Sequence, residues 1–553
     1  MSRGGLGSGD LFHQSSARTS RVHRPPSTIH GNFQKRVTVI SSPGSRKWWA
    51  LGAVFLTILC VGVDSTVLSV ALPTLAKSLH ASETDLQWFS SGYFLVLAAA
   101  MLPAGVLGDR YGHKRVFLIS LALFAMGSAG CAYSTTVTEF MAARVVLGLA
   151  GAGVIVMAIS SLTVLFDKED RPKAVGILGA GNFLAMPIGP ILGGWLLTNY
   201  WWGWVFLINV PIAAIGFVAA FALLPEFRAE KKPAFDLPGM AASVAGLVAL
   251  TYGLIKAGQN GWSDPGALLA ILVGIAIVVG FLAWERGLTQ RLGGRPLLDM
   301  TLFSSASFTW GAIFAALSFL ALIGVLFTMP QYFQGVLGTT AMGSGLRLLP
   351  LVAGVLIGAV PAAVIAKFVG AKLAVGAGFA LLAVGLAVGA ATNVDSSSVF
   401  VAVWMVIVGA GMGLALATST SAALVELSPE QSGVGSGVVE AIDEVGGPLG
   451  IAILGSVVGA GYIAHLKLSH LSAPAATAAR QSVFGGVAVA QRLHSTVLLE
   501  SVRTAFVHGM HVAFLVSVGI SLVGAVLALM FLPKTNAPPP AATDKEVDVD
   551  RAR

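Results

Sequence analysis

Apolar stretches of about 20 residues recur along most of this chain, and they constrain its fold more than any other feature. Fourteen of them are long enough to cross the hydrocarbon core of a bilayer as helices. Lipid excludes backbone groups without hydrogen bonds, so runs of this length favour spanning helices. The sequence therefore predicts an all-α polytopic membrane protein, with spans centred near residues 58, 96, 125, 151, 186, 214, 247, 276, 318, 355, 381, 412, 449 and 521.

Composition supports this prediction and excludes other classes. Hydrophobic residues make up 55% of the chain and charged residues only 11%, against about 25% charged in soluble domains. The net charge of +8 comes mostly from short segments between apolar stretches, so no nucleic-acid partner is expected. The two cysteines, Cys60 and Cys131, lie within apolar runs and offer neither a disulfide framework nor a thiolate metal site. We expect no metal and no cofactor.

The positions of lysine and arginine set the expected topology. With the N-terminus in the cytoplasm, most basic loops fall on the cytoplasmic side, as the positive-inside bias requires. The exception is an outer loop over 463–507, which holds four basic residues. We expect a multi-pass protein of the plasma (cell inner) membrane with both termini cytoplasmic.

Five regions follow from these spans. Residues 1–45 are polar and rich in Ser, Arg and Pro, which indicates a disordered cytoplasmic tail; a start codon assigned too early is the alternative. The other regions are a six-helix bundle over 46–225, a linker with two extra spans over 226–303, a second six-helix bundle over 304–532 that includes the outer loop 463–507, and a cytoplasmic tail over 533–553.

An internal repeat relates the two six-helix bundles. A shift of 258 residues places 108–114 on 366–372, and the same shift places Gly189-Pro190 on Gly447-Pro448. Related halves are common in transporters. A chance match in a glycine-rich chain is the alternative, but the shared offset favours two pseudo-symmetric halves.

The loop between spans two and three carries a dense motif. Its glycines permit close helix approach and positive φ, and its basic residues suit the inner headgroups. We expect this loop to latch the inward gate through Gly105, Gly108, Asp109, Arg110, Gly112, Lys114 and Arg115.

Span five carries a glycine stripe. Small residues on one helical face allow intimate packing, and a proline inside the helix favours a bend. Tight packing without any transport role is the alternative interpretation. The residues of this motif are Gly181, Gly189, Pro190, Gly193 and Gly194.

Both motifs resemble those of the major facilitator superfamily. Further segments resemble its fourteen-helix drug:proton antiporter branch: 64–73, 206–211, 331–334 and 345–350. The acids Glu440 and Asp443 resemble the members of this branch that export quaternary ammonium compounds. The resemblance covers residues 47 to 532 and implies proton-driven alternating access. Two positions depart from the family pattern: Leu147 replaces a glutamine, and Gly203 replaces an arginine between two tryptophans.

Two ionisable residues of the first half fall inside spans, where a charge costs about 2.5–3.5 kcal/mol. Asp64 lies late in span one and Arg144 early in span four, so both are expected at similar depth in the outer half. They are candidates for an ion pair or a proton relay. A salt bridge that only orients helices is the alternative.

Three more acids, Glu440, Asp443 and Glu444, lie in span thirteen. Spacings of three and four residues place them on one helical face. Clustered carboxylates repel one another, so the cluster is expected to bind a proton or a cation but not both well. The alternative is that the helix begins later and these acids are solvated loop charges.

These residues lead to a functional prediction. We expect a proton-coupled antiporter that exports lipophilic cations, in which Asp64, Arg144, Glu440, Asp443 and Glu444 carry coupling and cation recognition. Its partners are small lipophilic substrates, protons and the bilayer, with no obligate protein partner evident. One alternative is a dedicated exporter of a single natural product or antibiotic. A membrane-embedded enzyme or receptor is another, but no catalytic set supports it, and no phosphate-binding loop points to ATP.

Overall fold

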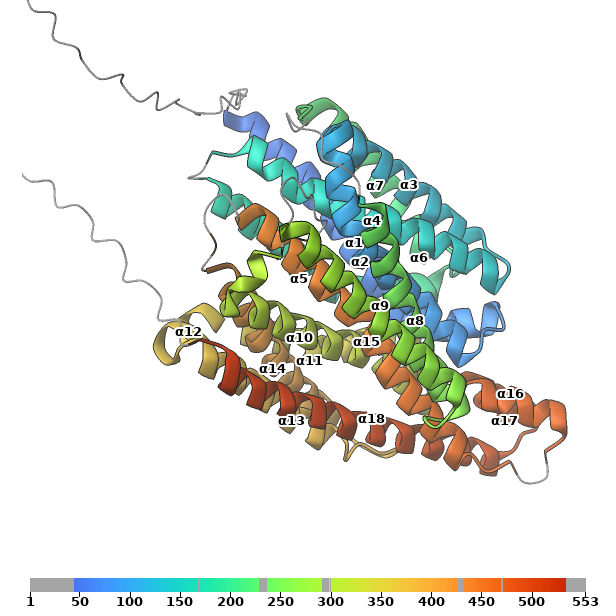
Figure 1. Ribbon diagram of the computed structural model, residues 1–553. Helices are drawn as coiled ribbons and strands as arrows, with labels where there is room; N and C mark the ends of the chain where they lie inside the picture. The colour runs from blue at the N-terminus through green and yellow to red at the C-terminus, as the bar shows by residue number, and fades with distance from the viewer. Residues whose placement is uncertain are drawn as a thin grey trace, which may run out of the picture. The chain divides into compact units, whose positions relative to one another are not determined.

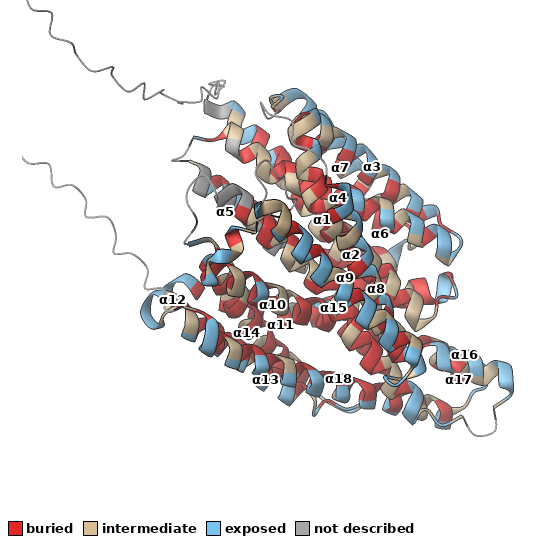
Figure 2. Ribbon diagram, in the orientation of Figure 1, coloured by how far each residue is buried: buried red, intermediate tan, exposed pale blue. Residues whose placement is uncertain are grey.

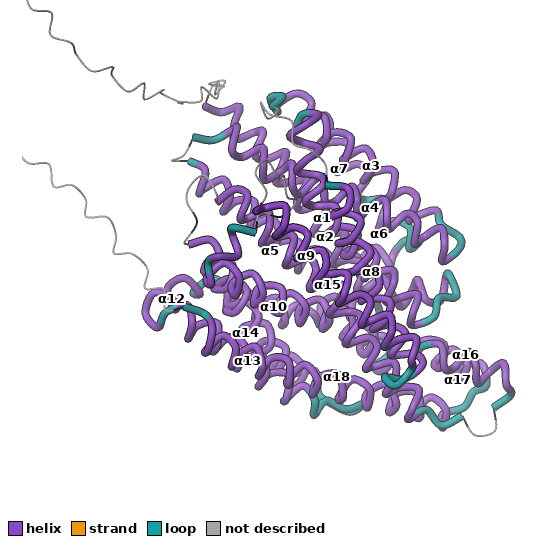
Figure 3. The backbone as a smooth tube through the Cα atoms, viewed as in Figure 1, coloured by secondary structure: helices purple, strands orange, loops and turns teal. Residues whose placement is uncertain are grey.

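The computed structural model describes residues 44–167, 170–227, 236–290, 298, 300–425, 427, 432–468 and 471–533. Helices joined by short loops make up this part of the chain, and its described residues contain no strand (Figure 3). Most of the two predicted tails, 1–43 and 534–553, lies outside the described residues.

The first half of the fold contains six spans, the last of which is interrupted after one turn. Its helices are α1 (Gly44–Ser78), α2 (Glu83–Tyr111), α3 (His113–Tyr133), α4 (Val137–Leu165), α5 (Arg171–Asn199), α6 (Trp204–Leu207) and α7 (Asn209–Leu223). Two further spans follow, α8 (Leu237–Asn260) and α9 (Pro265–Gln290).

The second half again contains six spans, together with several short elements. Its spans are α10 (Ala306–Gln331), α11 (Ala341–Ala359), α13 (Ala371–Gly389), α14 (Ser398–Val425), α15 (Ser432–His465) and α18 (Thr496–Phe531). The short elements are η1 (Leu302–Ser304), η2 (Tyr332–Val336), α12 (Ala362–Val369), α16 (Ala473–Gln481) and α17 (Val483–Arg492). Fourteen helices of the described chain are long and apolar enough to cross a membrane, which confirms the predicted number of spans.

The two halves repeat the same helix pairings. Helix α1 packs on α5 as α10 packs on α15, and α3 packs on α4 and α7 as α13 packs on α14 and α18. The 258-residue shift also holds for the backbone: Gly112 has a φ of 107° and Gly370 a φ of 85°, each directly before a helix. Only glycine adopts such angles without strain. The predicted pseudo-symmetric all-α fold is confirmed.

The ends of the helices form two faces. We call the face where α1 begins and α18 ends the termini face, on the left in Figure 1, and the face that carries α16 and α17 the opposite face. Buried residues line the contacts between helices, whereas exposed ones cover their outer sides (Figure 2). Exposed apolar side chains such as Leu269, Leu272 and Val279 on α9 suit a surface in contact with lipid.

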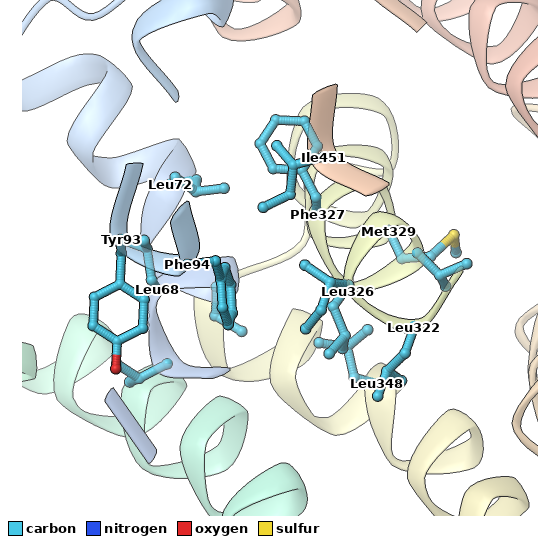
Figure 4. Close-up of a cluster of buried hydrophobic side chains, with 14 of the residues drawn as sticks. Leu68, Leu72, Tyr93, Phe94, Leu322, Leu326, Phe327, Met329, Leu348 and Ile451 are labelled. Carbon is cyan, nitrogen blue, oxygen red and sulfur yellow. The ribbon is translucent and has the colours of Figure 1, made fainter. Parts of the chain in front are cut away.

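Glycines bring the two halves into backbone contact toward the opposite face. A Cβ atom built on Gly194 of α5 would lie 2.7 Å from the Cα of Met342, and one on Gly345 of α11 would lie 2.3 Å from the carbonyl oxygen of Pro190. Gln334 also donates a hydrogen bond to the carbonyl of Val70 on α1, at 3.1 Å. Apolar side chains from both halves flank this interface, among them Leu68 and Phe94 from one half and Leu326 and Phe327 from the other (Figure 4).

The structure differs from the predicted outer loop over 463–507. Helix α15 extends to His465 and α18 already begins at Thr496, so the connection is shorter and contains α16 and α17. The Ser495 side chain caps α18 by accepting a hydrogen bond from the backbone N–H of Leu498. Leu498 and Val502 are buried, which anchors the extra turns of this helix by packing. Because residues at this end of α18 are polar, hydropathy did not predict that the helix begins before residue 507.

Candidate functional site

Asp64 and Arg144 form a buried ion pair in the first half. The Nη1 atom of Arg144 lies 2.9 Å from Oδ2 of Asp64, and both side chains are at most 1% exposed. The Arg144 guanidinium also donates from Nε to the carbonyl of Phe89 at 3.2 Å and lies 4.1 Å from the centre of the Tyr93 ring. The sequence named the two residues as candidates for an ion pair or a proton relay, and the structure places them in direct contact.

Asn209 joins this network, although the sequence alone predicted no role for it. Its Nδ2 donates to Oδ1 of Asp64 at 2.8 Å and to Oγ of Ser128 at 3.0 Å. Asn209 is 1% exposed at the start of α7. A polar amide inside a long apolar run was the available signal, because a buried amide needs partners. Five helices of the first half thus meet at one charge pair.

Glu440, Asp443 and Glu444 lie within α15, which begins at Ser432. The alternative that they precede the helix is therefore excluded. All three side chains are partly buried. Oδ1 of Asp443 and Oε2 of Glu444 are closed to solvent and accept no hydrogen bond from the described residues. Within the described chain, no basic side chain forms an ion pair with any of the three.

Glycine contacts show which way these carboxylates face. Gly447 lies against the Phe94 ring of α2, whereas Gly446 and Gly450 lie against the backbone of α10. Positions four and seven residues apart share a helical face. Glu440 and Glu444 therefore lie in line with Gly447 on the side of α2, which belongs to the first half.

Asp443 lies three residues before Gly446, on the side of α10. The row of acids thus faces the boundary between α2 and α10. A small cavity of about 20 Å³ lies further along this boundary, lined by Ser65, Ser90, Phe94 and Ile451 among others.

The 105–115 loop is held by residues at the end of α7 and directly after it. Nζ of Lys114 donates to the carbonyl of Phe221 at 2.6 Å. The backbone N–H of His113 donates to the carbonyl of Phe227 at 2.9 Å. Asp109 approaches Nε2 of His113 at 3.4 Å, and Arg115 approaches Glu226 at 3.7 Å.

The glycines of the loop motif differ in their surroundings. Gly108 faces Met157 of α4 so closely that a Cβ atom would lie 2.6 Å from its sulfur, whereas Gly105 has ordinary clearance. Arg110 lies with its guanidinium 5.8 Å from the Tyr111 ring centre.

The span-five glycines serve two contacts. Gly181, Gly189 and Gly193 face Phe55, Thr66 and Val67 of α1, so they hold α5 against its partner within the half. Gly194 and the carbonyl of Pro190 instead meet α11 of the other half. Helix α5 continues through both Pro187 and Pro190.

Comparison with known proteins agrees with this architecture. The family model for the Major Facilitator Superfamily matches residues 54–451. A tetracenomycin C resistance and export protein of Streptomyces glaucescens is 33% identical over 506 residues, which cover 89% of this chain and 93% of that protein. A methyl viologen resistance protein of Salmonella typhimurium is 29% identical over 496 residues, which cover 88% and 97% respectively.

A solved structure shares the fold. The inward-facing, unoccupied form of a bacterial homologue of the human lysosomal transporter Spinster aligns with a TM-score of 0.64 at 15% identity, covering 90% of this chain and all of that one. The fourteen spans and the repeated halves agree with the sequence matches: the chain belongs to the Major Facilitator Superfamily and is a multi-pass membrane transporter.

Proposed function

We propose that this transporter exports lipophilic organic cations in exchange for protons, by alternating access between its two halves. The observation that carries the proposal is the row of three acids on α15, which has no cationic partner within the described chain. A partly buried carboxylate needs either a proton or a positive charge beside it. Because one proton or one cation satisfies the same oxygens, the two compete, and competition for one site is the minimum that antiport requires.

The proposed cycle assigns each charged group a task. A proton that arrives from the outer side binds the Glu440, Asp443 and Glu444 row and displaces the cation outward. Release of that proton to the cytoplasm restores the site for the next cation. The buried Asp64–Arg144 pair holds α1 and α4 in register while the halves move.

The orientation in the membrane belongs to the same proposal. We assign the termini face to the cytoplasm and the protein to the plasma membrane, in keeping with the basic loops. Backbone contacts near Gly194 and Gly345 then lie on the outer side, which supports a conformation closed to the outside. The gradient of protons supplies the energy, so neither a bound cofactor nor a protein partner is required.

Two of the relatives support different substrate classes. Methyl viologen, named for the Salmonella relative, is an aromatic dication and fits an acidic row. Tetracenomycin C, named for the Streptomyces relative, favours a second candidate function, the dedicated export of one neutral or anionic natural product. The two candidates differ in what they require of the α15 acids.

Efflux from everted vesicles under an imposed pH gradient tests the proposal. We expect Glu440→Gln and Asp443→Asn each to slow extrusion of ethidium at least tenfold. Asp395→Asn is the matched control, since this carboxyl is exposed at the opposite face. Ethidium export at the wild-type rate by both acid variants would overturn cation recognition by this row. Wild-type export of a neutral polyketide by the same variants would favour the second candidate.

A further inference from the structure

A second cavity, of about 320 Å³, lies at the opposite face between α2, α8, α15 and α16. Its volume falls at the lower end of the range of pockets that hold drug-sized ligands. Its walls include Gly459 on α15, fifteen residues beyond Glu444, which corresponds to about 22 Å along a helix. The cavity is therefore separate from the proposed coupling row, and two of its walls, α8 and α16, lie outside the repeated six-helix plan.

The polar part of the lining includes a buried hydrogen-bond acceptor without a donor. Gln87 is only 4% exposed, and its Oε1 accepts no hydrogen bond from the described residues. Hydroxyl groups nearby already donate to the protein: Tyr462 to the carbonyl of Ala479 at 2.7 Å, and Ser456 to that of Leu254 at 2.9 Å. A buried acceptor left without a donor is destabilising. A ligand that brings a donor or a positive charge would recover this energy.

Glu83 supplies a carboxylate to the same wall. Its Oε1 accepts one hydrogen bond, from Nε2 of Gln331 at 3.2 Å, and no basic side chain of the described chain lies within 4 Å of it. The N-terminus of α2 does not need this residue, because Ser82 and Asp85 already form a reciprocal capping box. The carboxyl group at position 83 is thus available to a ligand.

The rest of the cavity is apolar and aromatic. Ile255, Val458, Phe506 and the ring of Tyr462 line it, and the last two are at most 3% exposed. Arg480 is the basic residue of the lining and is exposed at its edge, so water can solvate its charge. An apolar wall with one carboxylate and a free amide oxygen suits an organic cation with a hydrophobic body.

We infer that this cavity is a second binding site for lipophilic organic cations, at the face opposite the termini. That the ligand of this cavity is also an exported substrate rests on the proposed function. An exported cation that leaves the α15 row binds here, beside Glu83 and Gln87, before it reaches the water.

Binding of ethidium to the full-length protein in lipid nanodiscs, measured by equilibrium dialysis, tests the inference. We expect two ethidium ions per wild-type chain. Gly459→Leu should remove one, because a Cβ at this position has 3.9 Å of clearance to Glu83 and the longer side chain fills the cavity without a backbone clash. Gly519→Leu is the matched control on α18, where a Cβ meets nothing within 4 Å.

Charge variants test the ligand class. We expect Glu83→Gln to weaken the Gly459-sensitive site at least tenfold, and Asp395→Asn to leave it unchanged. Arg480→Gln should keep or strengthen ethidium binding. Loss of binding in Arg480→Gln, or one site per wild-type chain that ignores Gly459→Leu, would overturn the inference. Failure of the proposed function looks different: ethidium then binds at the Gly459-sensitive site but is not exported under a pH gradient.

Discussion

The two charged regions of this transporter differ in whether the chain supplies partners for their buried acids. In the first half, Asp64 is neutralised by Arg144 and receives a further hydrogen bond from Asn209. In the second half, Asp443 and Glu444 keep buried oxygens without any described partner. In the first region the chain itself supplies the counter-charge of the buried acid, whereas in the second region no described residue does so.

This difference separates structural charges from charges that handle a ligand. An enclosed ion pair holds its partners tightly, since removal of one leaves the other stranded in a low dielectric. An unpaired row gains nothing from the protein and is destabilising until a proton or cation arrives. Substitutions in the two regions should therefore change stability in opposite directions, which the following experiments measure.

The largest effect is expected from Arg144→Gln. The change leaves the Asp64 carboxylate buried without a counter-charge, and breaking such pairs costs about 3–5 kcal/mol. Thermal unfolding of the purified protein should show a lower midpoint and a loss of monodisperse material. The double variant Asp64→Asn with Arg144→Gln should recover much of the stability. An unchanged midpoint in the single variant would show that the pair does not hold the helices together.

A smaller loss is expected from Asn209→Ala. The side chain donates to a charged acceptor, but hydrogen bonds inside membranes average only about 0.6 kcal/mol and reach about 1.7 kcal/mol. We therefore expect a cost of about 1–2 kcal/mol in an unfolding titration. Ser128→Ala, which removes a neutral partner of the same amide, should cost less. Equal losses in the two variants would contradict the importance of the contact with Asp64.

Glu444→Gln should change stability in the other direction. The amide replaces a buried, unpaired charge on a helix that carries two neighbouring acids, so the unfolding midpoint should rise by an amount equivalent to about 1 kcal/mol. Ethidium export by the same variant should fall. A lower midpoint would indicate that Glu444 has a stabilising partner and would remove the contrast between the regions.

The smallest effect is expected at the termini face, where Lys47 bonds Asp170 at 2.7 Å in a partly exposed pair. The hydrogen bond and charge of Lys47 hold the pKa of Asp170 below its usual range. Its stabilisation is therefore present above about pH 3.9, the unfolded value, and is lost as the pH falls through the lower folded value. Asp170→Asn should shift the midpoint only slightly at pH 7, less so in high salt. A salt-independent shift would contradict a screened surface pair.

Much of the fold could be predicted because lipid imposes a strong rule on length and polarity. The span count follows from it, whereas the repeat, which pairs Gly112 with Gly370, follows from the motifs that recur after 258 residues. The extent of the 463–507 connection could not, because the first turns of α18 are amphipathic and pack against protein instead of lipid. Short helices such as α16 depend on tertiary contacts that leave no hydropathy signal.

The site was predictable in part. Charges inside spans, such as Asp64 and Arg144, stand out because each needs a compensating interaction within the bundle. Asn209 also stands out as an amide in an apolar run, but the sequence gives no indication that its partner is Asp64. The Glu83 cavity is built from segments more than 370 residues apart in sequence, and no local pattern encodes such a juxtaposition. Whether the α15 acids couple protons stays a prediction.

The glycine contacts at Gly194 and Gly345 have a mechanical consequence. Where α5 and α11 meet through backbone at these glycines, no side chains interlock, so the two helices can shift against each other at that point without a change of side-chain rotamer. The contact surface at these glycines consists of backbone atoms. A methyl group at position 345 would lie 2.3 Å from the carbonyl oxygen of Pro190. Helices α5 and α11 would therefore have to separate on that side of the transporter.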